Sequence, residues 1–134
     1  MSKKVKQKGG IIRKKEGPKE KWYYDACTLD KSKKTYSEIV NSQSYRVSIV
    51  SHLSLGEAYA NCREKGKEEF ESFSSLINIL EKYIKVVGND ASQGILDGIR
   101  QVFQELEITD SVHLATAIDN KCQVLRTNDR ICGA

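Results

Sequence analysis

The chain of 134 residues has no long hydrophobic run. No segment approaches the roughly 20 consecutive apolar residues of a membrane-spanning helix, and no hydrophobic signal-peptide core follows the N-terminus. Hydrophobic residues at 39% and charged residues at 30% are ordinary values for a soluble globular protein. The length is close to the commonest size of a single domain. We therefore expect one soluble domain with a cytoplasmic location.

Several catalytic and cofactor-binding motifs are also missing. The sequence contains neither a phosphate-binding P-loop nor the G-x-G-x-x-G pattern of dinucleotide-binding folds, and it shows no Ser–His–Asp order. Its four cysteines form no C-x-x-C pair, and no histidine stands at zinc-finger spacing from them: Cys27, Cys62, Cys122 and Cys132. We interpret them as reduced structural thiols. Cysteine–histidine catalysis through Cys27 or Cys62 has no motif to support it.

Positive charge is concentrated at one end of the chain. Residues 1–21 hold nine Lys or Arg residues and two Glu residues, a net charge of +7, whereas the remainder carries a net charge of −3. A basic arm of this kind suits attraction to phosphate backbones, and a solubilising tail is an equal alternative. We divide the chain into this flexible arm, residues 1–21, and a folded domain, residues 22–134. The candidate nucleic-acid-binding side chains of the arm are Lys3, Lys4, Lys6, Lys8, Arg13, Lys14 and Lys15.

Strand-like and helix-like patterns alternate along the folded domain. Short β-rich runs predict strands at residues 22–24, 45–50, 85–88 and 123–126. Between them, apolar residues at helical spacing predict helices at about 36–41, 52–65, 67–83, 90–103 and 110–119. One or two helices between successive strands are typical of a parallel sheet with both faces covered. The sequence therefore predicts the α/β class.

Capping residues fix where some of these helices are expected to begin. Ser51 or Ser54 can cap the second helix, and Ser54 with Glu57 matches the S-x-x-E capping box. Asn89 or Asp90 is the expected cap of the fourth helix, and Thr109 is the expected cap of the last.

Four acidic residues stand at element ends. Asp25 ends the first strand and Asp129 follows the last, while Glu57 and Asp110 lie in first turns of helices. In parallel sheets, ligands bind beyond the carboxyl ends of the strands, so three of these acids are expected at one rim. Asp110, whose helix follows another helix, is placed less tightly; it shares a face with apolar Leu114.

Carboxylates gathered at one rim repel one another unless a cation lies between them. A hard divalent ion, Mg²⁺ or Mn²⁺, prefers carboxylate and water ligands, and it can activate water and hold a phosphodiester. Each acid also has a simpler interpretation as a cap or a turn residue. His113, on the same helix as Asp110, is interpreted as a packed helix residue rather than a ligand, and His52 has no motif context.

Four fragments in order resemble the PIN-domain ribonucleases found among VapC-type toxins. They are WYYDACTLD, VSHLSLGEAYA, TDSVHLATAIDN and VLRTND, and together they extend over most of residues 22–132. The resemblance implies a Rossmann-like three-layer PIN fold, with a short central parallel sheet flanked by helices. It implies a metal-dependent endoribonuclease that hydrolyses RNA through a metal-activated water, either a toxin of a toxin–antitoxin pair or an RNA-processing nuclease.

The resemblance also assigns residues and partners. Asp25, Glu57, Asp110 and Asp129 become catalytic ligands of Mg²⁺ or Mn²⁺, and Thr127 or Asn128 orients a ligand or phosphate. The implied partners are RNA, an antitoxin protein and a second copy of the chain, with no membrane. Cys27 departs from the family, which often has a small hydroxyl or amide residue there. The alternative is a non-catalytic RNA- or protein-binding module on the same fold.

Overall fold

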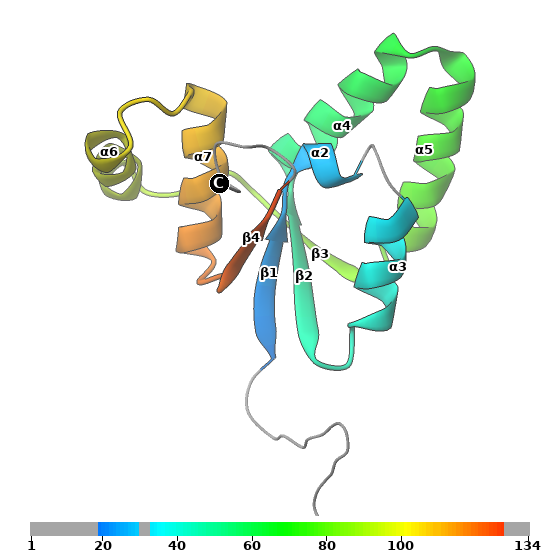
Figure 1. Cartoon of the computed structure of the whole chain (residues 1–134), viewed down its shortest axis with the longest axis horizontal. Coiled ribbons are helices and arrows are strands. Elements are labelled where there is room, and N and C mark those ends of the chain that lie inside the picture. Colours follow the sequence, from blue (N-terminus) through cyan, green and yellow to red (C-terminus); the bar gives the residue numbers. More distant parts are fainter. Residues whose placement is uncertain (1–18, 30–32, 128–134) are drawn as a thin grey trace, which may run out of the picture.

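A parallel sheet forms the centre of the protein. The computed structural model describes residues 19–29 and 33–127, and within them one sheet has the strand order β3-β2-β1-β4 (Figure 1). The strands are β1 (Glu20–Tyr24), β2 (Arg46–Ser51), β3 (Ile84–Val87) and β4 (Val124–Arg126). All three pairings are parallel, as the alternation of strands and helices predicts. Each predicted strand is confirmed within two residues of its expected start.

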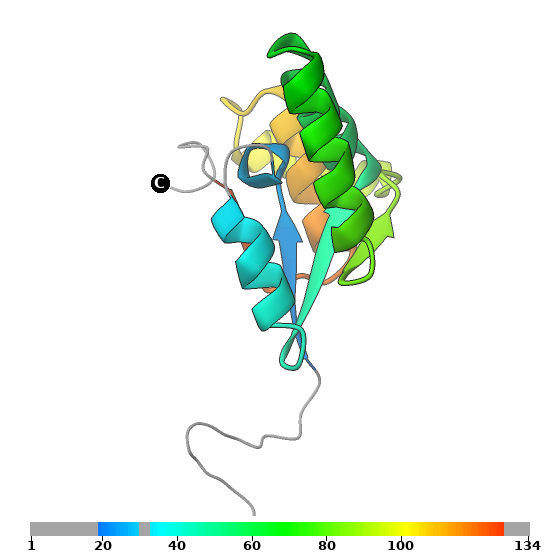
Figure 2. The same ribbon diagram turned by 90° about the vertical axis from the view of Figure 1, so that its right-hand side faces the viewer.

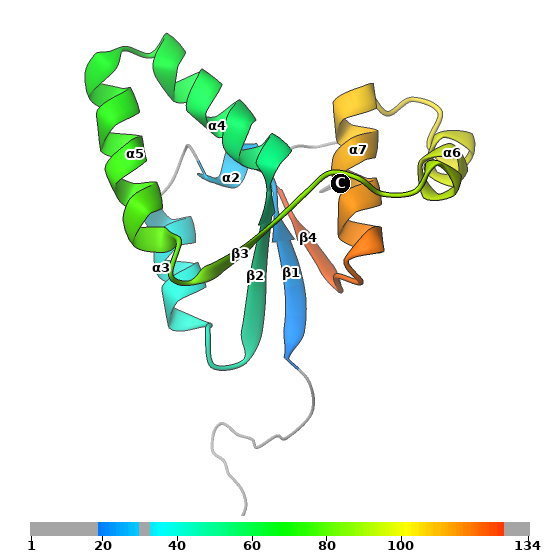
Figure 3. The same cartoon turned by 180° about the vertical axis from the view of Figure 1, so that it is seen from behind.

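Helices cover both faces of this sheet. They are α2 (Ala26–Leu29), α3 (Lys33–Asn41), α4 (His52–Glu64), α5 (Lys67–Leu80), α6 (Gln93–Val102) and α7 (Ile108–Asp119). One group, α2 to α5, lies on one side of the strands, and α6 and α7 lie on the other (Figures 1 and 3). Figure 2 looks onto the side that α3 and α5 cover. Within the described ranges, no helix has both the length and the hydrophobicity needed to cross a bilayer.

The two hydrophobic cores follow from the alternation of side chains along the strands. Tyr24 and Val50 point to the larger core, which they share with α2 to α5. Their neighbours Tyr23 and Ile49 point to the opposite face and pack with Ala117 of α7. All four strand residues are at most 1% exposed. The last residues of the two central strands are therefore buried on both faces of the sheet.

The predicted helix caps are partly wrong. Ser51 caps α4, and its side chain accepts the Ser54 N–H at 3.1 Å, so Ser54 lies inside the helix and forms no capping box with Glu57. The reason is that β2 passes directly into α4, and Ser51, the last strand residue, already has the extended backbone of a cap. The last helix begins one residue before Thr109, with Glu107 in the cap position.

The predicted cap of the fourth helix, Asn89 or Asp90, is also wrong. Ser92 caps α6 by accepting the Ile95 N–H at 3.3 Å. The Asn89 side chain instead accepts the Leu53 N–H at 2.9 Å and donates to Thr116 Oγ1 at 2.9 Å. It therefore joins the first turn of α4 to α7, a tertiary contact that no local pattern shows.

The direction of α7 determines at which edge of the sheet Asp110 lies, a point that the sequence left open. This helix leads through a short turn into β4, which is parallel to β1, so α7 runs opposite to the strands. Its first turn accordingly lies at the edge where the strands end (Figure 1). Asp110 is in that first turn. The carboxyl ends of the strands and the start of α7 thus meet at one rim of the sheet.

Candidate metal centre

Asp25 is the first acidic group of this rim. It directly follows β1, and its backbone N–H donates to the Arg126 carbonyl at 3.1 Å, which aligns it with the end of β4. The pairing brings Thr127 alongside, and the Thr127 hydroxyl donates to Asp25 Oδ2 at 2.8 Å. Asp25 is only 8% exposed. This buried carboxylate is therefore held from one side, with Oδ2 occupied by Thr127.

Glu57 reaches the same place from α4. Its side chain is about one third exposed, and Oε1 accepts a hydrogen bond from His113 Nε2 at 2.7 Å. The same ring nitrogen lies 3.9 Å from Asp25 Oδ1. One ligand atom from each of the three residues lies within 4.8 Å of the other two. A loop, α4 and α7 thus each contribute one donor to a single group.

His113 is the residue whose role the sequence interpretation missed. It is 3% exposed, as expected for a packed helix residue, yet both ring nitrogens have polar partners. Nδ1 lies 2.6 Å from the Tyr23 hydroxyl, which in turn lies 2.7 Å from Ser51 Oγ and 3.2 Å from Ser54 Oγ. Burial raises the pKa of Tyr23, so this side chain stays a neutral hydroxyl. The one available signal was the D-x-x-H spacing, which puts His113 one turn after Asp110.

The remaining predicted site residues divide into two groups. Asp110 is half-buried in the first turn of α7 and precedes His113 by three residues, but it is not part of the close group found among the described residues. Asn128 and Asp129 lie outside the described residues, as do the lysines and the arginine of the arm between Lys3 and Lys15. Their predicted roles stay predictions.

Cys27 contacts the residues that support the site, although the resemblance in sequence led us to expect a small hydroxyl or amide residue there. Its Sγ lies 3.4 Å from the Thr127 hydroxyl, the same hydroxyl that donates to Asp25. A thiol can donate weakly to an oxygen lone pair, as the expected small hydroxyl or amide residue also can. Cys27 is half-buried in α2. A sulfur atom therefore supplies a polar contact to Thr127 at this position.

The three clustered side chains form a suitable set of metal donors. Two carboxylates bring two negative charges, which a divalent cation balances, and a neutral imidazole adds a nitrogen ligand without further charge. Burial makes unpaired carboxylates costly, and each of these has a hydrogen-bond donor next to it. The residues present therefore fit a divalent metal ion.

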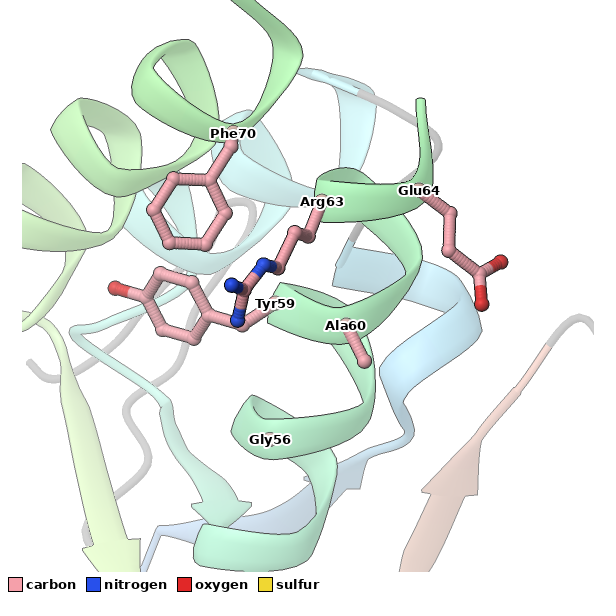
Figure 4. A pocket seen from close by; sticks show the side chains of 6 residues that line it. All are labelled: Gly56, Tyr59, Ala60, Arg63, Glu64 and Phe70. Atoms are coloured by element: carbon pink, nitrogen blue, oxygen red, sulfur yellow. The ribbon is translucent and has the colours of Figure 1, made fainter. Parts of the chain in front are cut away.

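A separate pocket lies between α4 and the start of α5. It has a volume of about 610 Å³ and is lined by Gly56, Tyr59, Ala60, Arg63, Glu64 and Phe70 (Figure 4). Tyr59 packs against Phe70 with ring centroids 5.6 Å apart, and this aromatic pair forms part of the wall. None of the three clustered donors lines this pocket. It is therefore distinct from the candidate metal centre.

Comparison with solved structures identifies proteins of the same fold. VapBC2 from Rickettsia felis, solved bound to a DNA fragment from its promoter, matches with a TM-score of 0.62 and 13% identity, over 81% of this chain and 87% of that chain. PAE2754 from Pyrobaculum aerophilum matches with a TM-score of 0.60 and 20% identity, over 84% and 82% of the two chains. VapC20 from Mycobacterium tuberculosis, a toxin that cleaves the sarcin–ricin loop, matches with a TM-score of 0.56 and 12% identity, over 81% and 90%.

These likenesses confirm the predicted α/β fold and, at the level of the fold, the resemblance to VapC-type PIN-domain proteins. Neither a scan against models of protein families nor a search of curated proteins finds a match to this sequence. Identities of 12–20% establish a shared fold, and function has to be argued from the site itself.

Proposed function

We propose that this protein is a metal-dependent endoribonuclease that hydrolyses RNA phosphodiester bonds. The observation that carries this proposal is the convergence of Asp25, Glu57 and His113 at the carboxyl edge of the parallel sheet. Ligands of parallel α/β sheets bind at this edge. The shared fold with VapC20, an RNA-cleaving toxin, favours nuclease chemistry over other uses of a divalent ion.

The proposed ion is Mg²⁺ or Mn²⁺, and Asp25 and Glu57 bind it. A divalent ion in such a site supplies an activated water and stabilises charge on the phosphate. The chain's own residues hold the ligands in place: Thr127 fixes one oxygen of Asp25, and His113 hydrogen bonds to Glu57. Asp110, at the same rim, and Asp129, which follows β4 in sequence, complete the proposed acidic ligands.

RNA cleavage with and without metal tests this proposal. Native protein in Mn²⁺ or Mg²⁺ should cleave a mixed RNA pool, and EDTA should stop the reaction. Asp25→Asn and Glu57→Gln should each lower the rate by more than about 100-fold, because each removes a charged ligand. Glu64→Gln, an exposed change on the same helix as Glu57, is the matched control and should stay within about twofold. RNA binding without metal-dependent cleavage would favour the non-catalytic alternative.

The basic arm is proposed to add affinity for RNA. Deletion of residues 1–18 leaves β1 whole, since that strand begins at Glu20. For every phosphate that the arm neutralises, the deletion should reduce the slope of log affinity against log salt by about 0.7 on single-stranded RNA. An unchanged slope would rule the arm out as a binding element.

An antitoxin is the proposed protein partner, because one structure of this fold is a VapBC assembly. Copurification of native protein with the product of an adjacent small reading frame, together with loss of RNA cleavage in that complex, would support it. Full cleavage activity in the complex would contradict it.

A further inference from the structure

We propose that His113 is a direct ligand of the metal ion through Nε2, which makes the centre a mixed nitrogen–oxygen site that prefers Mn²⁺ over Mg²⁺. This inference rests on the metal of the proposed function, and it concerns the chemistry of the ligands rather than the reaction. Imidazole nitrogen suits transition metals, whereas Mg²⁺ prefers oxygen ligands alone. An all-carboxylate centre has no such preference built into it.

Asp25 and His113 are each anchored through one atom and leave a second atom facing the cluster. Asp25 has Oδ2 occupied by the Thr127 hydroxyl, and its other oxygen, Oδ1, lies toward His113. His113 has Nδ1 occupied by the Tyr23 hydroxyl, and its other nitrogen, Nε2, lies toward both Asp25 and Glu57. Metal-binding histidines almost always have the second ring nitrogen held by a protein oxygen, which fixes the ring. His113 shows that arrangement.

The polar atoms behind the His113 ring can accept the proton of the tautomer that binds a metal through Nε2. A ligating Nε2 needs the ring proton on Nδ1, where it is donated to the Tyr23 oxygen. The Tyr23 O–H must then point elsewhere, and Ser51 Oγ at 2.7 Å can accept it. Ser51 Oγ has room, because it accepts one other bond, from the Ser54 N–H, and gives its own proton to Ser54 Oγ. Every group keeps a partner.

Without metal, the same atoms support the opposite arrangement. Glu57 is a carboxylate and can only accept, so a proton sits on His113 Nε2 and is donated at 2.7 Å. The Tyr23 O–H then donates to Nδ1. Conversion of one arrangement into the other requires the Tyr23 hydroxyl to rotate and the ring proton of His113 to exchange through solvent from Nε2 to Nδ1. Each group of this network has a partner in both arrangements.

The distances favour direct binding of the metal by His113 over a role as a hydrogen-bond donor to Glu57 alone. Nε2 lies 2.7 Å from Glu57 and 3.9 Å from Asp25, so it faces both carboxylates. Ligand atoms of an octahedral ion with bonds of 2.0–2.1 Å are about 3.0 Å apart along each edge. A histidine that only donates a hydrogen bond to Glu57 needs no second carboxylate nearby. That role gives no reason for Asp25 Oδ1 to lie on the same side of the ring.

Electron spin-echo spectroscopy of bound Mn²⁺ tests the ligand directly. Native protein loaded with Mn²⁺ should show modulation from a directly bound ¹⁴N nucleus, and protein labelled with ¹⁵N-histidine should show the modulation change to that of ¹⁵N. His113→Gln keeps an N–H donor for Glu57 but offers no imidazole, so it should bind Mn²⁺ without nitrogen modulation. Tyr23→Phe keeps the ring and should retain the modulation, with Mn²⁺ affinity lowered about 10- to 100-fold.

Competition between Mn²⁺ and Mg²⁺ gives the second readout. The ratio of the two affinities should fall about tenfold in His113→Gln, because only Mn²⁺ gains from the nitrogen. Mn²⁺ bound to native protein without nitrogen modulation overturns the proposal and leaves the proposed nuclease intact. Nitrogen modulation in a protein that cleaves no RNA supports the ligand and overturns the nuclease, whereas failure to bind Mn²⁺ overturns both.

Discussion

Replacing Tyr23 by phenylalanine is the most informative single change in this protein. The side chain is fully buried, and its hydroxyl contacts Ser51, Ser54 and His113 at 2.7, 3.2 and 2.6 Å. Phenylalanine fills the same volume, so the change creates almost no cavity and isolates the hydroxyl. Ser51 keeps its bond from the Ser54 N–H, but Nδ1 of the buried His113 ring loses the hydroxyl. One buried unsatisfied group costs about 1–3 kcal/mol.

Thermal unfolding in EDTA measures this loss without any contribution from metal. A cost of about 2 kcal/mol, at about 4 °C per kcal/mol for a domain of this size, lowers the Tm by about 8 °C. Tyr45→Phe is the control, because Tyr45 is 60% exposed and should leave the Tm unchanged. A Tyr23→Phe protein that unfolds within about 2 °C of native would refute the reasoning, since the hydroxyl would then have no structural value.

Three further changes test other parts of the site and core. Thr127→Val should lower Mn²⁺ affinity about 10- to 100-fold, because it removes the hydroxyl that donates to Asp25. Thr127→Ser keeps a hydroxyl and should retain most of the affinity. An equal loss of affinity in both variants, measured by calorimetry, would point to packing instead. Asp110→Asn should reduce RNA cleavage by more than about 100-fold in a gel assay, whereas retained cleavage would remove Asp110 from the ligands. Burial, followed by Glu38, raises the pKa of Tyr24 to about 12, above 10 in the unfolded chain. Stability should therefore fall as the pH rises from 10 to 12, and Tyr24→Phe should lessen that slope by up to about 1.4 kcal/mol per pH unit in urea titrations; an unchanged slope would contradict the assignment.

The fold could be predicted largely from the chain because its strongest signals are local. Trp22–Tyr24 is a short aromatic run, and residues 45–50 alternate and are rich in β-branched side chains. Both patterns are typical of strands. The alternation with helices then fixed the parallel topology, and the parallel topology placed Asp25 and Glu57 at one edge.

Helix starts were less predictable, because they depend on tertiary contacts. Ser51 and Ser54 both have the right hydroxyl, and the choice between them follows from where β2 ends. Asn89 is a good cap by composition, yet its side chain joins α4 to α7 instead. A sequence pattern ranks such candidates equally, since each can satisfy the same orphan N–H groups.

The role of His113 could not be predicted from the residues around it in the sequence. Around it the helix is apolar, and a histidine in such a setting is usually a packed residue, which it is. Packing alone does not satisfy a histidine, however, because an imidazole has two ring nitrogens and each buried one requires a partner. Local sequence offers none, so the partners had to come from distant elements: Tyr23, 90 residues away, and Glu57, 56 residues away. A buried histidine on an apolar helix therefore predicts two polar groups elsewhere in the chain, and when one of them is a rim carboxylate, the histidine belongs to the site.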